Sequence, residues 1–145
     1  MPTEIHHGDT ENTEKADGKF SQYEESALTE RVIGMAIEVH RYLRPGLLES
    51  AYEECLCFEF RTAGVAYECQ VALPVHYKSV HLSCGYRLDV VIERRLIVEI
   101  KSVDHLLPIH EAQLLTYLRL SGMKVGLLMN FNCVVLKDGL RRFVM

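Results

Sequence analysis

Residues 95–103 read RLIVEIKSV, an apolar run typical of a β-strand that is interrupted by two charged residues, Glu99 and Lys101. An unpaired charge destabilises a buried strand, because the charged group loses its hydration without gaining a partner. The two charges must therefore lie on a face of the strand where something offsets them. The identity of that partner decides both the fold and the function predicted for the chain.

The strand-like segment before it, residues 80–92, is expected to pair with this strand through a turn around Glu93-Arg94-Arg95. Successive side chains of a strand point to opposite faces of the sheet. One face of the pair carries only apolar residues: Leu88, Val90, Ile92, Leu96, Val98 and Ile100. This face should pack against helices. The other face is apolar near the turn and charged at the far ends, where it carries Arg87, Asp89, Glu99 and Lys101.

The register of the pair follows from this burial pattern. A turn of one or three residues around Arg94 keeps the apolar face intact and places Asp89 opposite Glu99, whereas a two-residue turn mixes the faces. Two facing carboxylates repel each other unless a proton or a cation lies between them. One interpretation is a site for a hard divalent ion such as Mg²⁺, which prefers oxygen ligands, with Lys101 beside it. An ordinary cross-strand charge network that includes Arg87, without a metal, explains the strands equally well.

Two predicted helices carry polar residues that would complete such a site. Each helix has one triplet spaced three and four residues apart on a single face: Glu49, Tyr52 and Glu53 on the first, and His110, Gln113 and Tyr117 on the second. Gln113 stands in an apolar run, AQLLTYL, where a polar side chain needs a partner. His110 is expected at a helix N-terminus without a catalytic role, and His105 is the weaker alternative for a general base.

The order of the predicted elements indicates the fold class. Helices are predicted over residues 26–43, 47–64 and 109–122, strands over 66–78, 80–92, 95–102 and 124–131, and a C-terminal hairpin with its turn at Asp138-Gly139. The order ααβββαβ with a terminal hairpin predicts a single domain of the α/β or α+β class.

Charge and composition set the N-terminal segment apart. The first 30 residues hold eight acidic and two basic residues, a net charge of −6, although the whole chain carries only −4. We expect residues 1–22 to be a disordered acidic tail and residues 23–145 to form the domain. No apolar run approaches the roughly 20 residues that span a bilayer, so a cytoplasmic protein without a membrane partner is expected. The five cysteines form no CxxC pair and are expected to be reduced, mostly buried thiols.

These residues carry a resemblance to a known family. The chain resembles the GxxExxY proteins, a branch of the PD-(D/E)xK nuclease superfamily with a restriction-endonuclease-like fold. The naming motif is Gly46-Leu-Leu-Glu49-Ser-Ala-Tyr52, the superfamily signature is Asp89 with Glu99-Ile-Lys101, and a Gln-x-x-x-Tyr motif is Gln113-Leu-Leu-Thr-Tyr117. The resemblance covers about residues 29–143, with these motifs in order and at matching spacing.

The resemblance implies a central mixed sheet flanked by helices and a nuclease site that uses Mg²⁺ or Mn²⁺. The implied metal ligands are Asp89, Glu99, the Ile100 carbonyl and, directly or through water, Glu49. Lys101 would position the nucleophilic water, and Gln113 and Tyr117 would orient Lys101 or contact the nucleic-acid backbone.

Three functions remain open at this point. The first is a nuclease that hydrolyses phosphodiester bonds, of DNA rather than RNA, by a metal-activated water. The second is a non-catalytic nucleic-acid- or protein-binding module that retains the nuclease scaffold, which suits the small size and the weak positive charge of the folded part. The third is a subunit that acts only as a homodimer or with a larger protein partner.

Overall fold

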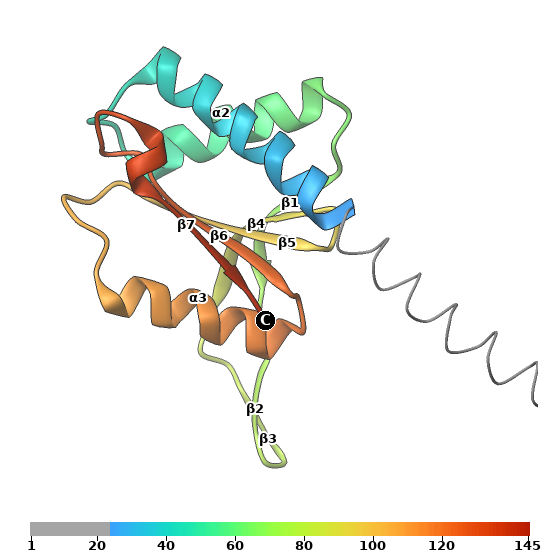
Figure 1. The fold of residues 1–145 in the computed structure, drawn as a ribbon. Helices are drawn as coiled ribbons and strands as arrows, with labels where there is room; N and C mark the ends of the chain where they lie inside the picture. Colours follow the sequence, from blue (N-terminus) through green and yellow to red (C-terminus); the bar gives the residue numbers. More distant parts are fainter. Residues whose placement is uncertain (1–23) are drawn as a thin grey trace, which may run out of the picture.

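The computed structural model describes residues 24–145, which form a mixed sheet between two layers of helices (Figure 1). The predicted acidic tail, residues 1–22, lies outside the described residues. Residues 24–43 are helical. The elements that follow are α2 (Glu49–Thr62), β1 (Tyr67–Ala72), β2 (Val75–Tyr77), β3 (Val80–Leu82), β4 (Arg87–Ile92), β5 (Leu96–Lys101), α3 (Pro108–Ser121), β6 (Val125–Asn130), a 3-10 helix η1 (Leu136–Gly139) and β7 (Leu140–Val144).

The central sheet has five strands in the order β1-β4-β5-β6-β7. All neighbours are antiparallel except β5 and β6, which are parallel and are joined by the crossover helix α3. The helix over residues 24–43 and α2 cover one face of the sheet, and α3 covers the other (Figure 1). The predicted α/β fold with a mixed sheet flanked by helices is confirmed. No helix within residues 24–145 is long and apolar enough to cross a membrane.

The predicted register of β4 and β5 is also confirmed. Ile92 pairs with Leu96 and Val90 with Val98 across a turn of three residues, 93–95. The apolar face of the pair packs against residues 24–43 and α2, as the alternation predicts. Leu88 is the exception, because it joins the cluster beneath α3 with Val91, Ile97 and Leu114 on the opposite face.

The two long strands predicted over residues 66–78 and 80–92 are each interrupted. Residues 73–74 separate β1 from β2, and residues 83–86 separate β3 from β4. Pro74 has no backbone N–H for the sheet, and Gly85 has a φ of +71° that a strand residue does not adopt. The strands β2 and β3 consequently pair only with each other and form an arm that projects from the body past α3 (Figure 1).

The C-terminal antiparallel pair forms between β6 and β7 instead of within residues 134–145. The predicted turn at Asp138-Gly139 lies in η1, where Gly139 allows a close approach of the chain. A Cβ atom at Gly139 would clash with the Asn130 carbonyl oxygen. The C-terminal strand can therefore return along β6 only because residue 139 is a glycine.

Candidate active site

Asp89 and Glu99 lie opposite each other where β4 and β5 begin to separate. The backbone pairing of the two strands ends at Val90 and Val98. Beyond this point the Asp89 N–H donates to Glu99 Oε1 at 3.1 Å, and the Ile100 N–H donates to Asp89 Oδ2 at 2.8 Å. Each carboxylate thus accepts a hydrogen bond from a backbone N–H of the neighbouring strand, and this N–H has no carbonyl partner in the β4–β5 pairing.

Glu99 is a buried carboxyl group, with only 4% of its surface exposed. Burial is the main cause that raises its pKa to about 8, and the charge of Asp89 raises it further. The hydrogen bond from the Asp89 N–H and the charge of Lys101 act in the opposite direction. At pH 7 Glu99 is therefore mostly protonated unless a cation displaces the proton.

The metal-free charge network does not form among the described residues. The ion pairs of residues 24–145 are Arg94–Glu68, Arg95–Glu24 and Arg141–Glu111. Arg87 donates to the Gln70 carbonyl oxygen at 3.4 Å, and Lys101 forms no ion pair with any residue in the described part of the chain. The interpretation of these charges as a cross-strand salt-bridge network is therefore wrong.

The glycine and the tyrosine of the GxxExxY motif build the turn that precedes α2. Gly46 has a φ of +107°, in a region that residues with a Cβ atom rarely adopt. Tyr52 donates its hydroxyl hydrogen to the Arg44 carbonyl oxygen at 2.6 Å and accepts from the Leu47 N–H at 3.1 Å. Its ring is fully buried and stacks on Phe131 at a centroid distance of 4.5 Å. Tyr52 is therefore a structural residue of the motif.

This turn brings Glu49 to the end of β5. Ser102 donates through Oγ to the Leu47 carbonyl oxygen at 2.6 Å, and the Ser102 N–H donates to Glu49 Oε1 at 3.3 Å. Because Ser102 directly follows Lys101, the Glu49 carboxylate lies at the same end of β5 as Lys101 and Glu99. The structure thus brings together two motifs that are far apart in the sequence.

Glu53 and Gln70 also belong to this region, although neither was among the predicted catalytic or metal-binding residues. Burial is the main cause that raises the pKa of Glu53. A hydrogen bond from Gln70 lowers it, and the charges of Asp89 and Glu49 raise it again. Gln70 Nε2 lies 3.2 and 3.1 Å from the two carboxylate oxygens of Glu53.

The backbone of Gln70 is unusual for a strand. Its φ is +52°, and it stands opposite Asp89 at the one position where the pairing of β1 and β4 is interrupted. Such conformations are costly for a residue other than glycine and cluster at functional sites. The spacing of Glu53 from Glu49 pointed to its shared helix face, but nothing in the strand sequence YECQVA marks Gln70, because a positive φ cannot be read from residue type.

The α3 residues of the predicted site lie beside these carboxylates. Gln113 Nε2 donates to the Tyr117 hydroxyl at 2.8 Å, which supplies the partner that its apolar surroundings require. Burial, followed by the charge of Glu99, raises the pKa of Tyr117. His110 has a different function: its Nδ1 accepts from the Leu107 N–H at 3.0 Å and caps α3.

The gathered side chains fit a hard divalent cation by their chemistry. The oxygen donors are the carboxylates of Glu49, Glu53, Asp89 and Glu99, and the ammonium group of Lys101 is close enough to lower the pKa of Glu99. Within residues 24–145, no three side chains of His, Cys, Asp or Glu are already close enough to hold an ion. A metal would therefore require these donors to come closer together than they are here. The pKa of Glu53 and of Glu99 is raised mainly by burial and then by the charge of Asp89, and a cation would offset that second contribution.

Comparison with known proteins agrees with this geometry. The family model of the PD-(D/E)XK nuclease superfamily matches residues 26–143, a range that includes every residue of the candidate site. The chain belongs to the PD-(D/E)XK nuclease superfamily. Glu99-Ile100-Lys101 has the (D/E)XK form of the superfamily's name, and Asp89 faces it from the neighbouring strand. No curated protein and no solved structure matches the chain.

Proposed function

We propose that the protein is a metal-dependent nuclease that hydrolyses the phosphodiester bonds of DNA. The observation that carries this proposal is the facing pair of Asp89 and Glu99, which no cation of the described chain neutralises in an ion pair. Lys101 stands next to the pair and is likewise free of ion pairs with described residues. Membership of the nuclease superfamily supports hydrolysis of nucleic acid as the chemistry.

Each residue has a role that its position suits. Asp89 and Glu99, with the Ile100 carbonyl and Glu49, would hold Mg²⁺ or Mn²⁺. The bound ion would neutralise phosphate charge and make a water molecule more acidic. Lys101 would hold that water or stabilise the negative charge that develops on the phosphate in the transition state.

The hydrogen-bonded pair of Gln113 and Tyr117 would orient Lys101 or contact a backbone phosphate. The pair is held on α3, and α3 is fixed on the sheet because Leu114 lies directly over Gly126. A Cβ atom at Gly126 would come within 2.9 Å of the Leu114 side chain. The close contact of helix and strand therefore sets the distance of the Gln-Tyr pair from the carboxylates.

The test compares cutting of DNA by the full chain with millimolar Mg²⁺, with Mn²⁺ and with EDTA. Asp89→Asn and Lys101→Met should each lower the cutting rate by roughly 100-fold or more, since they remove a charge from the reacting centre. Glu59→Gln, a carboxylate on α2 outside the site, is the matched control and should cut at the wild-type rate. Unchanged thermal unfolding would show that the variants are folded. Wild-type protein that binds no divalent ion at millimolar concentration would contradict the proposal.

The alternative is a non-catalytic nucleic-acid- or protein-binding module on the same scaffold. The absence of three converging metal-ligand side chains within residues 24–145 favours it. Calorimetric titration with Mn²⁺ separates the two functions, because a binding module would capture DNA without taking up the ion. Measurement of the mass in solution would show whether a homodimer or a larger protein partner is involved.

A further inference from the structure

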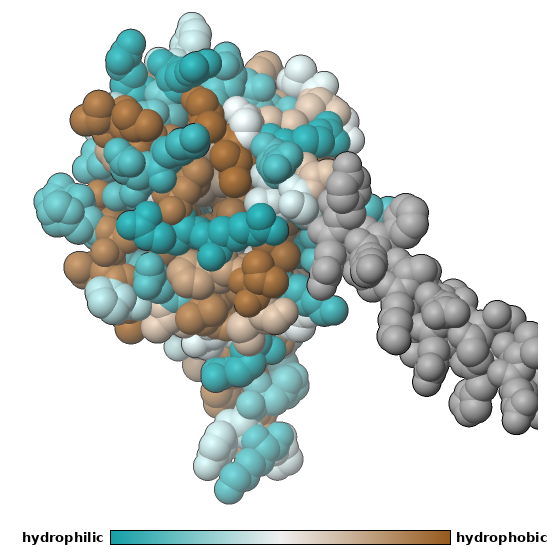
Figure 2. Space-filling view, in the orientation of Figure 1, coloured by the Kyte–Doolittle hydropathy of each residue, from teal (hydrophilic) through white to brown (hydrophobic). Residues whose placement is uncertain are grey.

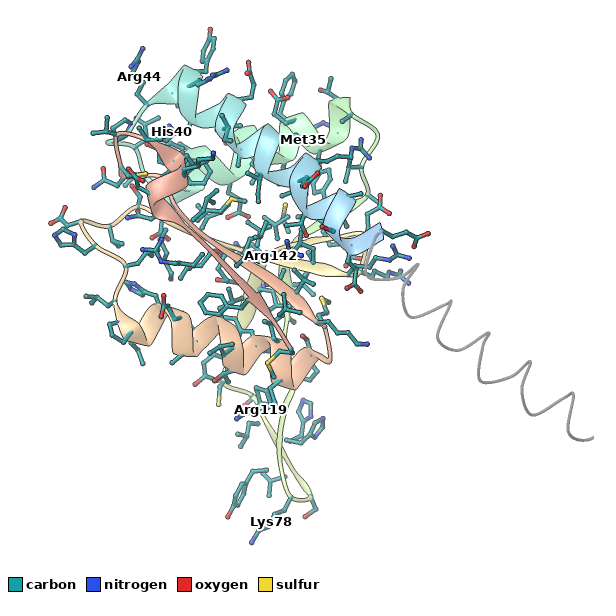
Figure 3. The ribbon with its side chains drawn as sticks, viewed as in Figure 1. Met35, His40, Arg44, Lys78, Arg119 and Arg142 are labelled. Carbon is teal, nitrogen blue, oxygen red and sulfur yellow. The ribbon has the colours of Figure 1, made fainter. Side chains whose placement is uncertain are left out.

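The arm formed by β2 and β3 is the most isolated part of the described chain. Its two strands pair with each other and with no strand of the central sheet. His76 and His81 pair across it with a ring centroid distance of 4.6 Å, and both side chains are exposed. Figure 3 shows Lys78 at the tip of the arm, pointing away from the body, and hydrophilic side chains surround this tip in Figure 2. An exposed ribbon that contributes nothing to the core is available for a partner.

A cavity of about 650 Å³ lies between the base of the arm and α3. Val75 and Tyr86, at the two ends of the arm, form one side of it, and Gln113 and Tyr117 are among the α3 residues on the other side. The rings of Tyr86 and Tyr117 meet edge to face at 6.4 Å, and Tyr86 is 46% exposed. The cavity therefore shares Gln113 and Tyr117 with the candidate active site.

The charge around this cavity suits a polyanion. No acidic residue occurs between Glu68 and Asp89, so the whole arm lacks a carboxylate. None of the residues that line the cavity is acidic either. Arg119 on α3 lines the cavity, Lys78 lies at the tip of the arm (Figure 3), and Arg87, the first residue of β4, directly follows Tyr86. None of the three forms an ion pair with another described residue.

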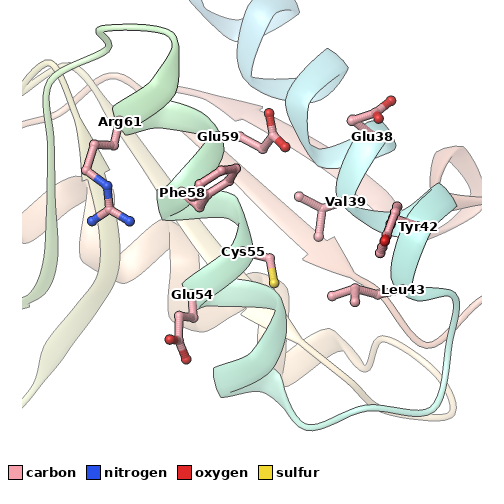
Figure 4. A pocket seen from close by; sticks show the side chains of 9 residues that line it. All are labelled: Glu38, Val39, Tyr42, Leu43, Glu54, Cys55, Phe58, Glu59 and Arg61. Carbon is pink, nitrogen blue, oxygen red and sulfur yellow. The ribbon is translucent and has the colours of Figure 1, made fainter.

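A second cavity provides the contrast. It has a volume of about 460 Å³ and lies between residues 24–43 and α2 (Figure 4). Three carboxylates line it, those of Glu38, Glu54 and Glu59, against the single cation Arg61. A phosphate backbone would be repelled there. Of these two cavities, only the one beside the arm has a cation and no carboxylate in its lining, and only this one includes Gln113 and Tyr117 of the candidate site.

We infer that the arm and the cavity at its base bind an unpaired segment of nucleic acid, with a base against Tyr86 and the phosphates along Lys78, Arg87 and Arg119. A largely apolar cavity with an exposed tyrosine favours the flat face of a base, which a duplex keeps inside its stack. The strand would continue past Tyr86 and Arg87 to Asp89, three residues further along the same segment. This inference rests on the proposed function, and it defines the strand that the site receives.

The test measures binding of labelled oligonucleotides to the full chain in EDTA, where no metal-dependent cutting occurs. Single-stranded DNA should bind at least several-fold more tightly than a blunt duplex of the same sequence. Tyr86→Ala should weaken single-strand binding roughly 5- to 100-fold, and Tyr86→Phe should retain it, because the ring provides the stacking surface. Phe58→Ala, in the acidic cavity, is the matched control and should bind like wild type.

Two further measurements complete the test. Lys78→Gln should reduce the slope of log affinity against log salt by about 0.7, the value for one phosphate of a single strand. Binding of a single-stranded RNA of the same sequence shows whether the cavity accepts ribose, deoxyribose or both. The inference is supported if either single strand binds more tightly than the duplex. Equal affinity for single strand and duplex, or equal losses in Tyr86→Ala and Phe58→Ala, would overturn it.

The inference and the proposed function can fail separately. Binding in EDTA does not require cutting, so a preference for unpaired strands would stand even if the protein proved inactive with metal. Metal-dependent cutting of a blunt duplex by a protein without this preference would keep the proposed function and overturn the inference alone.

Discussion

Glu99 connects the geometry of the site with a dependence on pH. Burial and the charge of Asp89 raise its pKa to about 8, so the carboxyl group keeps its proton at pH 7 when no metal is bound. In the proposed site Glu99 is a metal ligand, and because such a ligand must be deprotonated, Mg²⁺ would have to displace this proton. We expect the Mg²⁺ affinity to rise about tenfold per pH unit from pH 6 towards pH 8 and then to level off. Calorimetry in buffers of different ionisation enthalpy would count the released proton.

In the absence of metal, Glu99 should also make the free energy of unfolding depend on pH. Whereas the Mg²⁺ affinity rises with pH, this free energy should fall. The pKa of Glu99 is higher in the folded than in the unfolded chain, so the folded state binds the proton more tightly and loses stability as the pH rises towards 8. Glu99→Gln cannot ionise and should remove this contribution. Urea unfolding in EDTA at pH 6 and pH 9 checks both proteins. A wild-type slope no steeper than that of Glu99→Gln would contradict the prediction.

Tyr52 shows that a residue of a functional motif can serve the fold. Tyr52→Phe keeps the ring on Phe131 but leaves the Leu47 N–H and the Arg44 carbonyl without their hydroxyl partner. We expect the free energy of unfolding to fall by about 1–3 kcal/mol. Chemical denaturation measures this loss. Tyr67→Phe, whose hydroxyl has a weaker, exposed contact with Arg61 at 3.3 Å, is the control and should change stability little.

At the scale of the elements, patterning predicted most of the sheet and missed the arm. Alternation of apolar residues and the three-residue turn determined the register of β4 and β5, because a slip by one residue would expose the core face. Helix ends were similarly readable from glycine: Gly64 and Gly122 follow α2 and α3 with φ values of +71° and +75°. The breaks at residues 73–74 and 83–86 were missed, because alternation continues through segments that leave the sheet.

The candidate site was predictable only where a motif pattern existed. Asp89, Glu99 and Lys101 could be located because strand alternation places them together. Gln70 could not be located in this way, since its place in the candidate site follows from its positive φ and from its hydrogen bonds to Glu53. Such tertiary features depend on how β1 lies beside both α2 and β4, and local sequence does not record that arrangement.

Two cysteines, Cys57 and Cys69, meet where α2 contacts β1. The prediction that the thiols are mostly buried does not hold for all of the cysteines. Cys57 is buried on α2 and Cys69 is exposed on β1, yet their sulfur atoms are only 2.9 Å apart. Cys84 is exposed as well. Burial and the contact with Cys69 raise the pKa of Cys57, so the accessible Cys69 thiol should react first with an oxidant.

We expect a small-molecule disulfide to oxidise Cys57 and Cys69 to a disulfide bond. The two thiols lose two protons and two electrons, and the reagent is reduced to two thiols. A closed loop of this length should stabilise the fold by roughly 3 kcal/mol, seen as a higher unfolding midpoint that dithiothreitol reverses. Cys57→Ser should abolish the shift, whereas Cys84→Ser should preserve it. Peptide mapping that finds Cys69 joined to Cys84 instead would contradict the prediction.

At the scale of the whole molecule, the positive charge that binds nucleic acid must be local. Residues 24–145 contain fifteen acidic and fourteen basic residues, so the described part as a whole hardly attracts a polyanion. Residues 1–23 add five acidic residues against two lysines. Counterion release scales with the cations that contact phosphates and not with net charge, so the acid-free arm can provide affinity that the whole protein lacks.

The acidic N-terminal segment should then oppose this attraction. Replacement of Glu11, Glu14 and Asp17 by Gln, Gln and Asn in the full chain should raise the affinity for single-stranded DNA several-fold at low salt, because three negative charges that repel a polyanion are removed. The gain should vanish near 1 M salt, where the Debye length is about 3 Å. Uncharged replacements in the same stretch, Thr10→Ser, Asn12→Gln and Thr13→Ser, should leave the affinity unchanged. Equal low-salt affinities of the two triple variants would show that these charges do not act on the bound strand.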